Sequence, residues 1–107
     1  KDISGQIISY ISNNYEENLT LTSIANRFGV SKYSLSRMFS NVLGVSFYQY
    51  INLLRIDFAE ILLVNTDLSI TDIAIKCGYN NQQTFNRAFK DRNKTTPSMF
   101  RKKMLNS

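Results

Sequence analysis

The sequence contains no histidine and only one cysteine, which limits the chemistry open to it. Zinc sites are built largely from histidine and cysteine side chains, so the usual ligand sets cannot be assembled. A serine or cysteine nucleophile that is activated by histidine is likewise impossible. The sequence also has neither a glycine-rich phosphate loop nor a dinucleotide-binding fingerprint. We therefore expect no catalytic activity, no metal and no cofactor.

Long apolar runs are also missing, since none approaches the roughly 20 residues that a membrane-spanning helix needs. We expect no membrane segment. The first residues, Lys1-Asp2-Ile3, resemble neither a signal peptide nor a natural start, which predicts a piece of a longer protein. The single cysteine, Cys77, cannot form an internal disulfide, and we interpret it as a small buried side chain rather than a reactive thiol.

Apolar residues recur at helical spacing throughout, and alternation with a period of two is absent. The sequence predicts an all-α fold with about seven helices. Residues suited to N-caps mark their starts: Thr20, Ser31, Ser46, Ser69, Asn81 and Thr96. We expect the fourth helix to bury one continuous stripe, formed by Phe47, Tyr50, Ile51, Leu54, Phe58, Ile61 and Leu62.

One pattern occurs twice in the chain. Its first copy is Ile24-Ala25-x3-Gly29-x5-Leu35-x-Arg37-x-Phe39, and its second is Ile73-Ala74-x3-Gly78-x6-Phe85-x-Arg87-x-Phe89. The turn after Gly78 is one residue longer than the turn after Gly29. Each copy has the form helix, glycine turn, helix, which is typical of a helix-turn-helix that places its second helix in the DNA major groove. We expect a first subdomain at 1–45, a linker helix at 46–64 and a second subdomain at 65–107.

The positive charge is concentrated in the second copy. The net charge is +5, and residues 81–107 hold seven Lys or Arg against one acid, whereas residues 1–80 hold six against seven acids. Such a local excess is expected of a protein that binds a polyanion. A solvated basic tail is the alternative, but its coincidence with the second repeat favours nucleic acid.

The start of the second helix in each copy presents polar side chains on one outward face. We predict that these side chains read base edges: Lys32, Tyr33, Ser36, Arg37, Gln82, Gln83, Asn86 and Arg87. Arginine can pair with guanine, an amide with adenine, and an aromatic ring can contact a thymine methyl. We predict phosphate contacts for residues at helix starts and for basic residues: Ser31, Asn81, Thr84, Lys90, Arg92, Lys94 and Arg101.

Two other functions compete with duplex binding. The chain could be a helical interaction module whose partner is RNA polymerase or another acidic protein surface. It could also bind single-stranded nucleic acid or RNA, which would require exposed aromatic side chains. Most tyrosines and phenylalanines fall on apolar stripes, and Tyr33 and Tyr48 are the expected exceptions.

The pattern resembles the DNA-binding domain of AraC/XylS-type bacterial transcription regulators over almost the whole chain. The residues that carry the resemblance include the two repeat copies above, Tyr50-Ile51-x3-Arg55 in the linker and Thr96-Pro97-x2-Phe100-Arg101 near the end. The chain departs from the family at Lys94, where glycine is usual. The left-handed turn expected there costs a lysine some strain, or the turn differs.

The resemblance implies a fold of seven helices, with two helix-turn-helix subdomains joined by the fourth helix. It also implies duplex DNA as the partner and a location in the bacterial cytoplasm. In this family the domain usually follows an effector-binding, dimerisation or receiver domain, which would lie N-terminal to this sequence. RNA polymerase is a further partner that the family suggests.

Overall fold

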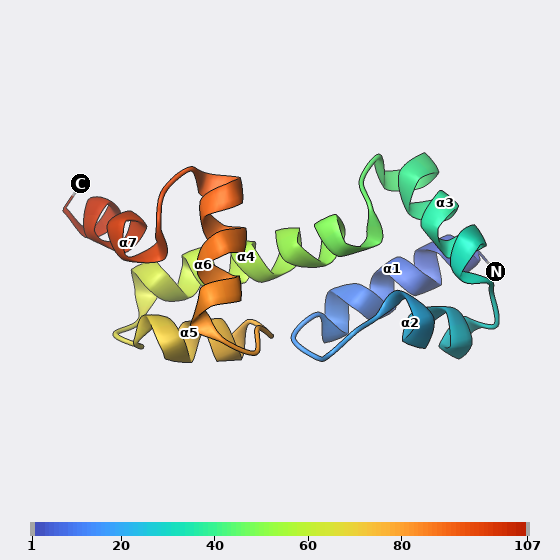
Figure 1. The fold of residues 1–107 in the computed structure, drawn as a ribbon, viewed down its shortest axis with the longest axis horizontal. Coiled ribbons are helices and arrows are strands. Elements are labelled where there is room, and N and C mark those ends of the chain that lie inside the picture. The colour runs from blue at the N-terminus through green and yellow to red at the C-terminus, as the bar shows by residue number, and fades with distance from the viewer. Residues whose placement is uncertain (1, 107) are drawn as a thin grey trace. The chain divides into compact units, whose positions relative to one another are not determined.

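The computed structural model describes residues 2–106, and within them it contains seven α-helices and no strand (Figure 1). The helices are α1 (Ile3–Asn14), α2 (Leu21–Phe28), α3 (Lys32–Leu43), α4 (Phe47–Asn65), α5 (Ile70–Lys76), α6 (Gln82–Asn93) and α7 (Pro97–Leu105). This confirms the all-α prediction and the number of helices. None of the helices in this range is both long enough and apolar enough to cross a bilayer.

The helices from α2 to α7 begin at the predicted caps. In each case the side-chain oxygen of the cap residue accepts a hydrogen bond from the backbone N–H three positions later, at 2.8 to 3.2 Å: Thr20, Ser31, Ser46, Ser69, Asn81 and Thr96. Each bond satisfies a backbone donor that the helix itself leaves without a partner. Pro97 then occupies the first position of α7, where its missing N–H costs nothing.

The chain forms two compact units, and the boundary between them lies inside α4, between Leu53 and Leu54. Unit 1 contains α1, α2, α3 and the first turns of α4, whereas unit 2 contains the rest of α4 with α5, α6 and α7. The linker helix is therefore shared between the two units rather than standing between two separate subdomains. The sequence does not show this division, because the division depends on which core each turn of α4 joins.

Unit 1 has its own apolar core. Its buried side chains come from all four of its helices and from the loop before α2: Ile7, Ile11, Leu19, Ile24, Ala25, Leu35, Phe39, Phe47 and Ile51. The ring of Phe39 contacts that of Phe47 edge-on, with 5.5 Å between centroids. This contact joins α3 to α4 within the unit, and it fixes the side of α3 that faces inward.

Unit 2 has a second core, built mainly from α4, α5 and α6. Its buried residues are Ile56, Ala59, Leu63, Ile73, Ala74, Cys77, Tyr79, Phe85 and Phe89. Cys77 is completely buried, and burial raises the pKa of its thiol to about 12. The burial confirms the small buried side chain that the sequence predicts.

The predicted apolar stripe of α4 is only partly right in the second half of the helix, where Phe58 and Leu62 are half-buried against the core of unit 2. Ile61, which the stripe includes, is 57% exposed. The buried positions there are Ile56, Ala59 and Leu63, all at most 1% exposed, and the stripe includes none of them. A single stripe assumes a single core, but α4 belongs to two units and each core selects its own face of the helix.

Lys94 ends α6 in the left-handed conformation, with φ 61° and ψ 18°. It is the only residue other than glycine with positive φ among residues 2–106. Its counterpart in unit 1, Gly44, ends α3 with φ 71°. The turn before α7 thus keeps the geometry that glycine normally supplies, and of the two alternatives the strained lysine is the one observed.

Replacing Lys94 with glycine should stabilise unit 2. The left-handed conformation costs a residue with a Cβ about 1–2 kcal/mol. Glycine loses about 0.5–1 kcal/mol more conformational entropy on folding. We therefore expect a net gain of roughly 0.5–1 kcal/mol in unfolding free energy, measured by urea denaturation followed by circular dichroism. Lys94→Ala is the matched control, since it removes the ammonium but keeps the strain, and it should give no gain. If both variants gained the same unfolding free energy, the gain would come from removing the charge of Lys94 and not from relieving the strain.

Candidate nucleic-acid interface

The two units contain the same turn, between α2 and α3 in unit 1 and between α5 and α6 in unit 2. In unit 1, Gly29 adopts φ 68° after α2, and Val30 N–H donates to the carbonyl of Ala25 at 3.0 Å. In unit 2, Gly78 has φ 108°, and Tyr79 N–H donates to the carbonyl of Ala74, also at 3.0 Å. These bonds close α2 and α5 in the same way. The repeat in the sequence is therefore a repeat in structure.

The second helix of each turn has a buried side and an exposed side. Leu35 and Phe39 of α3 are at most 1% exposed, and their counterparts Phe85 and Phe89 of α6 are fully buried. These residues fix the rotation of each helix about its own axis. Of the eight predicted base-reading residues, two on each helix precede the first buried position and two lie between the buried positions, and six of the eight are exposed.

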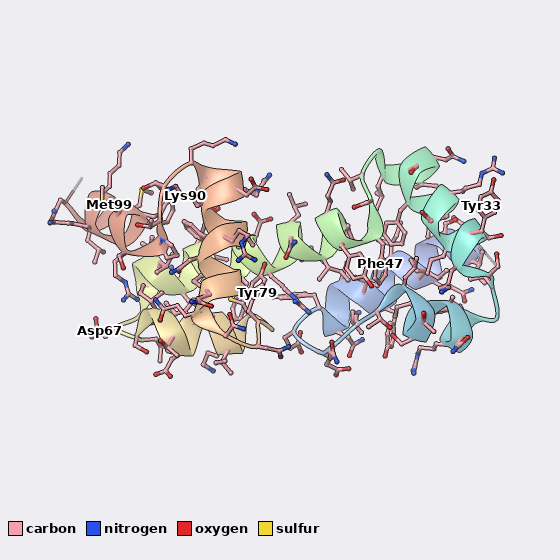
Figure 2. The ribbon with its side chains drawn as sticks, viewed as in Figure 1. Tyr33, Phe47, Asp67, Tyr79, Lys90 and Met99 are labelled. Carbon is pink, nitrogen blue, oxygen red and sulfur yellow. The ribbon has the colours of Figure 1, made fainter. Side chains whose placement is uncertain are left out.

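The outward face of α3 carries a stacked pair. Tyr33 is 70% exposed, and the guanidinium of Arg37 lies over its ring, 5.5 Å from the centroid. Figure 2 shows Tyr33 on α3, in unit 1. Lys32 and Ser36 are exposed on the same helix. Stacking of Arg37 on Tyr33 restricts its rotamers, so less entropy is lost when the guanidinium meets a planar acceptor pair.

The side chains on the outward face of α6 are more restricted than those on α3, by burial and by one hydrogen bond. Gln83 and Arg87 are exposed, whereas Gln82 and Asn86 are half-buried. The hydroxyl of Thr71, on α5, donates a hydrogen bond to Oε1 of Gln82 at 2.5 Å. Oδ1 of Asn86 is buried and has no hydrogen-bond partner within the described residues. The two units therefore present different chemistry at equivalent positions.

These contacts bear on how the amides of α6 can read bases. A bidentate contact with adenine needs the amide oxygen as acceptor and the amide nitrogen as donor. Oδ1 of Asn86 is inaccessible as it stands, and Oε1 of Gln82 already accepts from Thr71. Gln83 is exposed and makes no side-chain hydrogen bond within residues 2–106. It is the amide of α6 whose two polar atoms are both available.

The residues predicted to contact phosphate have differing surroundings. The side-chain oxygens of Ser31 and Asn81 serve as N-caps, while Thr84 at the start of α6 is exposed. Lys90 and Arg92 project from the second half of α6 and are also exposed; Lys90 is labelled in Figure 2. Helix N-termini and mobile basic side chains both suit phosphate, and these roles stay predictions.

Two of the predicted phosphate residues also serve the fold. Nζ of Lys94 donates to the carbonyl of Asp91 at 2.9 Å, at the end of α6. The guanidinium of Arg101 donates from Nε to the carbonyl of Leu63 at 3.0 Å and from Nη2 to that of Thr66 at 3.2 Å. Arg101 therefore satisfies carbonyls at the end of α4 and complements the dipole of that helix. A phosphate contact would have to use its remaining N–H groups.

Thr71 is not among the site residues predicted from the sequence, because it lies on the first helix of its turn and not on the second. A signal for it exists, since Thr22 stands at the same position of the first repeat, 49 residues earlier. The repeat shows that threonine follows the first apolar residue of both α2 and α5. It does not show which side chain the hydroxyl meets.

Two helix-turn-helix units within one all-α chain define the class of protein. The family model that describes a helix-turn-helix domain matches residues 24–103. An uncharacterized helix-turn-helix-type transcriptional regulator of Bacillus subtilis, YtdP, is 39% identical over 94% of this chain, which spans 13% of that relative.

Solved structures agree with the family match. The C-terminal domain of AraT, a response regulator from Geobacillus stearothermophilus, is 35% identical, with a TM-score of 0.92 over 96% of this chain and 86% of the other. A transcriptional regulator of the AraC-type DNA-binding-domain group from Chromobacterium violaceum is 32% identical, with a TM-score of 0.80 over 92% and 88%. The chain belongs to the helix-turn-helix family, in its AraC-type branch, as the resemblance of the sequence implied.

Proposed function

We propose that the chain binds double-stranded DNA in a sequence-specific manner to regulate transcription, with α3 and α6 as its two reading helices. The observation that carries the proposal is the duplicated turn with a polar face on each second helix. Arg37 and Arg87 occupy equivalent positions on those faces, 50 residues apart, and both are exposed. Arginine pairs with guanine in the most common specific contact of the major groove.

The two units should occupy successive major grooves of one duplex. They are direct repeats within one chain, so no two-fold axis relates them and the two halves of the site need not mirror each other. The helix that they share, α4, has 19 residues and is about 28 Å long, at roughly 1.5 Å per residue. Successive major grooves on one face of a duplex are one turn of roughly 34 Å apart, so we expect half-sites about 10 base pairs apart.

The chain should be the DNA-binding part of a larger regulator. It spans 13% of the length of its curated relatives, and the similar AraT structure is the C-terminal domain of a response regulator. We propose that an effector-binding, dimerisation or receiver domain precedes it, and that the whole protein acts on chromosomal DNA in the bacterial cytoplasm. A contact with RNA polymerase would add to DNA binding rather than replace it.

Selection of binding sites from random duplexes tests the proposed function. We expect one enriched, non-palindromic site with two conserved blocks about one helical turn apart. Affinity for that site should fall steeply as the salt concentration rises, because phosphate contacts release counterions. Competition with single-stranded DNA and RNA of the same sequence is the control. Enrichment of no sequence, with retention of a protein partner instead, would support the interaction-module alternative.

A further inference from the structure

We propose that Thr71 is a positioning residue that turns Gln82 into a hydrogen-bond donor toward DNA, so that Gln82 selects a base with a keto oxygen. In the major groove these bases are guanine and thymine. The inference rests on the proposed function and adds to it the chemistry of one position in the site. It differs from the general expectation for glutamine, which is a bidentate contact with adenine.

The contact between α5 and α6 fixes the orientation of the amide. Thr71 is exposed on α5, and its Oγ1 donates to Oε1 of Gln82, the first residue of α6. Since the oxygen end of the amide faces Thr71, the NH₂ group lies at the opposite end. Gln82 is half-buried, so its side chain has less freedom than that of the neighbouring Gln83, which is exposed. In the structure this bond holds the side chain in the sense that places Oε1 beside Thr71.

The orientation of an amide decides which bases it can recognise. An outward NH₂ group offers only donors, which match O6 and N7 of guanine or O4 of thymine. Cytosine offers only its N4 amino donor in the major groove, so it leaves an outward NH₂ group without an acceptor. Adenine offers N7 but also a donor at N6, and that donor would need the amide oxygen, which is turned toward Thr71. A fixed donor therefore disfavours cytosine most and adenine less.

The equivalent pair in unit 1 provides an internal comparison. Thr22 stands at the repeat position of Thr71, and Lys32 stands at that of Gln82. Both are exposed, and no hydrogen bond joins them within the described residues. An ammonium group has only donors, so Lys32 needs no partner to fix its sense. Thr22→Val is therefore a matched control for Thr71→Val.

The test measures base preference at one position of the selected site. Gln82→Ala first locates the position, which is the one where this variant loses preference. Duplexes that carry each of the four bases there are then titrated with the wild-type chain and with each variant. For the wild type we expect keto bases to bind about 2- to 10-fold more tightly than cytosine, the range for one hydrogen bond. Thr71→Val should reduce that ratio to near one, while Thr71→Ser and Thr22→Val should preserve it.

Gln82→Glu gives the sharpest readout, because it keeps an oxygen that can accept from Thr71 and replaces the outward NH₂ group with a second oxygen. The preference should then invert toward cytosine, whose N4 amino group donates. Repulsion between the carboxylate and DNA lowers affinity for all four duplexes alike, so the ratio among them is unaffected. A carboxylate at the first turn of α6 also suits the helix dipole, so this variant should fold.

Three results would overturn the inference. A wild-type preference for cytosine or adenine at this position would mean that the amide is turned the other way. A loss of affinity in Thr71→Val that is equal for all four bases would make Thr71 a phosphate contact. An unchanged profile in Gln82→Ala would mean that Gln82 does not meet a base. Each of these leaves a selected site in place, whereas failure of the proposed function would leave no selected site at all.

Discussion

Inserting five base pairs between the two halves of the selected site should abolish most of the specific affinity. Half a helical turn moves the second major groove to the opposite face of the duplex, where a unit on the same chain cannot reach it. One unit's base contacts are then lost. Two bidentate contacts of about 1–3 kcal/mol each correspond to a loss of about 2–6 kcal/mol, measured by titration of a labelled duplex.

Two further duplexes control this experiment. Replacing five spacer base pairs without changing the length should have little effect, since neither unit reads them. An insertion of ten base pairs restores the face but adds about 34 Å to the separation of the half-sites, so affinity should remain low. If the five-base-pair insertion caused no loss, the two units would not bind together. The tandem proposal would then fail, even if one unit still bound DNA.

Replacing either Arg37 or Arg87 with alanine should weaken specific binding by about 1–3 kcal/mol and relax one position of the site. Each guanidinium is exposed on the polar face of its helix, and Arg37 is held over the ring of Tyr33. Both variants should keep their helical circular dichroism, because neither side chain is buried. The measurement is a titration against duplexes that carry each base at the affected position.

Lys90→Ala is the matched control for the arginine variants. Lys90 is exposed on the second half of α6, away from the predicted base-reading start of the helix. The Lys90→Ala variant should lose affinity equally for specific and random duplexes, and the slope of log affinity against log salt should fall by about one. An arginine variant that behaved in this way would be a phosphate contact. Loss of helical signal would instead make that arginine structural.

Much of the fold could be predicted from the sequence because its signals are local. Thr20, Ser31, Asn81 and Thr96 cap helices at the predicted residues, since a cap needs only its own side chain and a backbone donor three positions later. The repeated glycine turn could also be predicted, because its signal lies within a few residues. The exposed positions on α3 and α6 followed from helical periodicity once the buried phenylalanines were recognised. Their roles as DNA contacts remain predictions.

Three features were decided only by tertiary structure. The fully buried positions in the second half of α4 are Ile56, Ala59 and Leu63, which the predicted stripe omits, because a helix shared by two cores has no single apolar period. Arg101 donates to carbonyls at the end of α4 that lie 35 and 38 residues away in the sequence.

The sense of the Gln82 amide is the third feature, and it depends on the hydroxyl of Thr71 across the turn. The sequence by itself determined the family, the seven helices and the polar faces, since caps, turns and periodicity act within a few residues. Only the tertiary structure decided which of those polar groups already have partners. Hydrogen bonds between helices join residues whose separation in the sequence carries no signal.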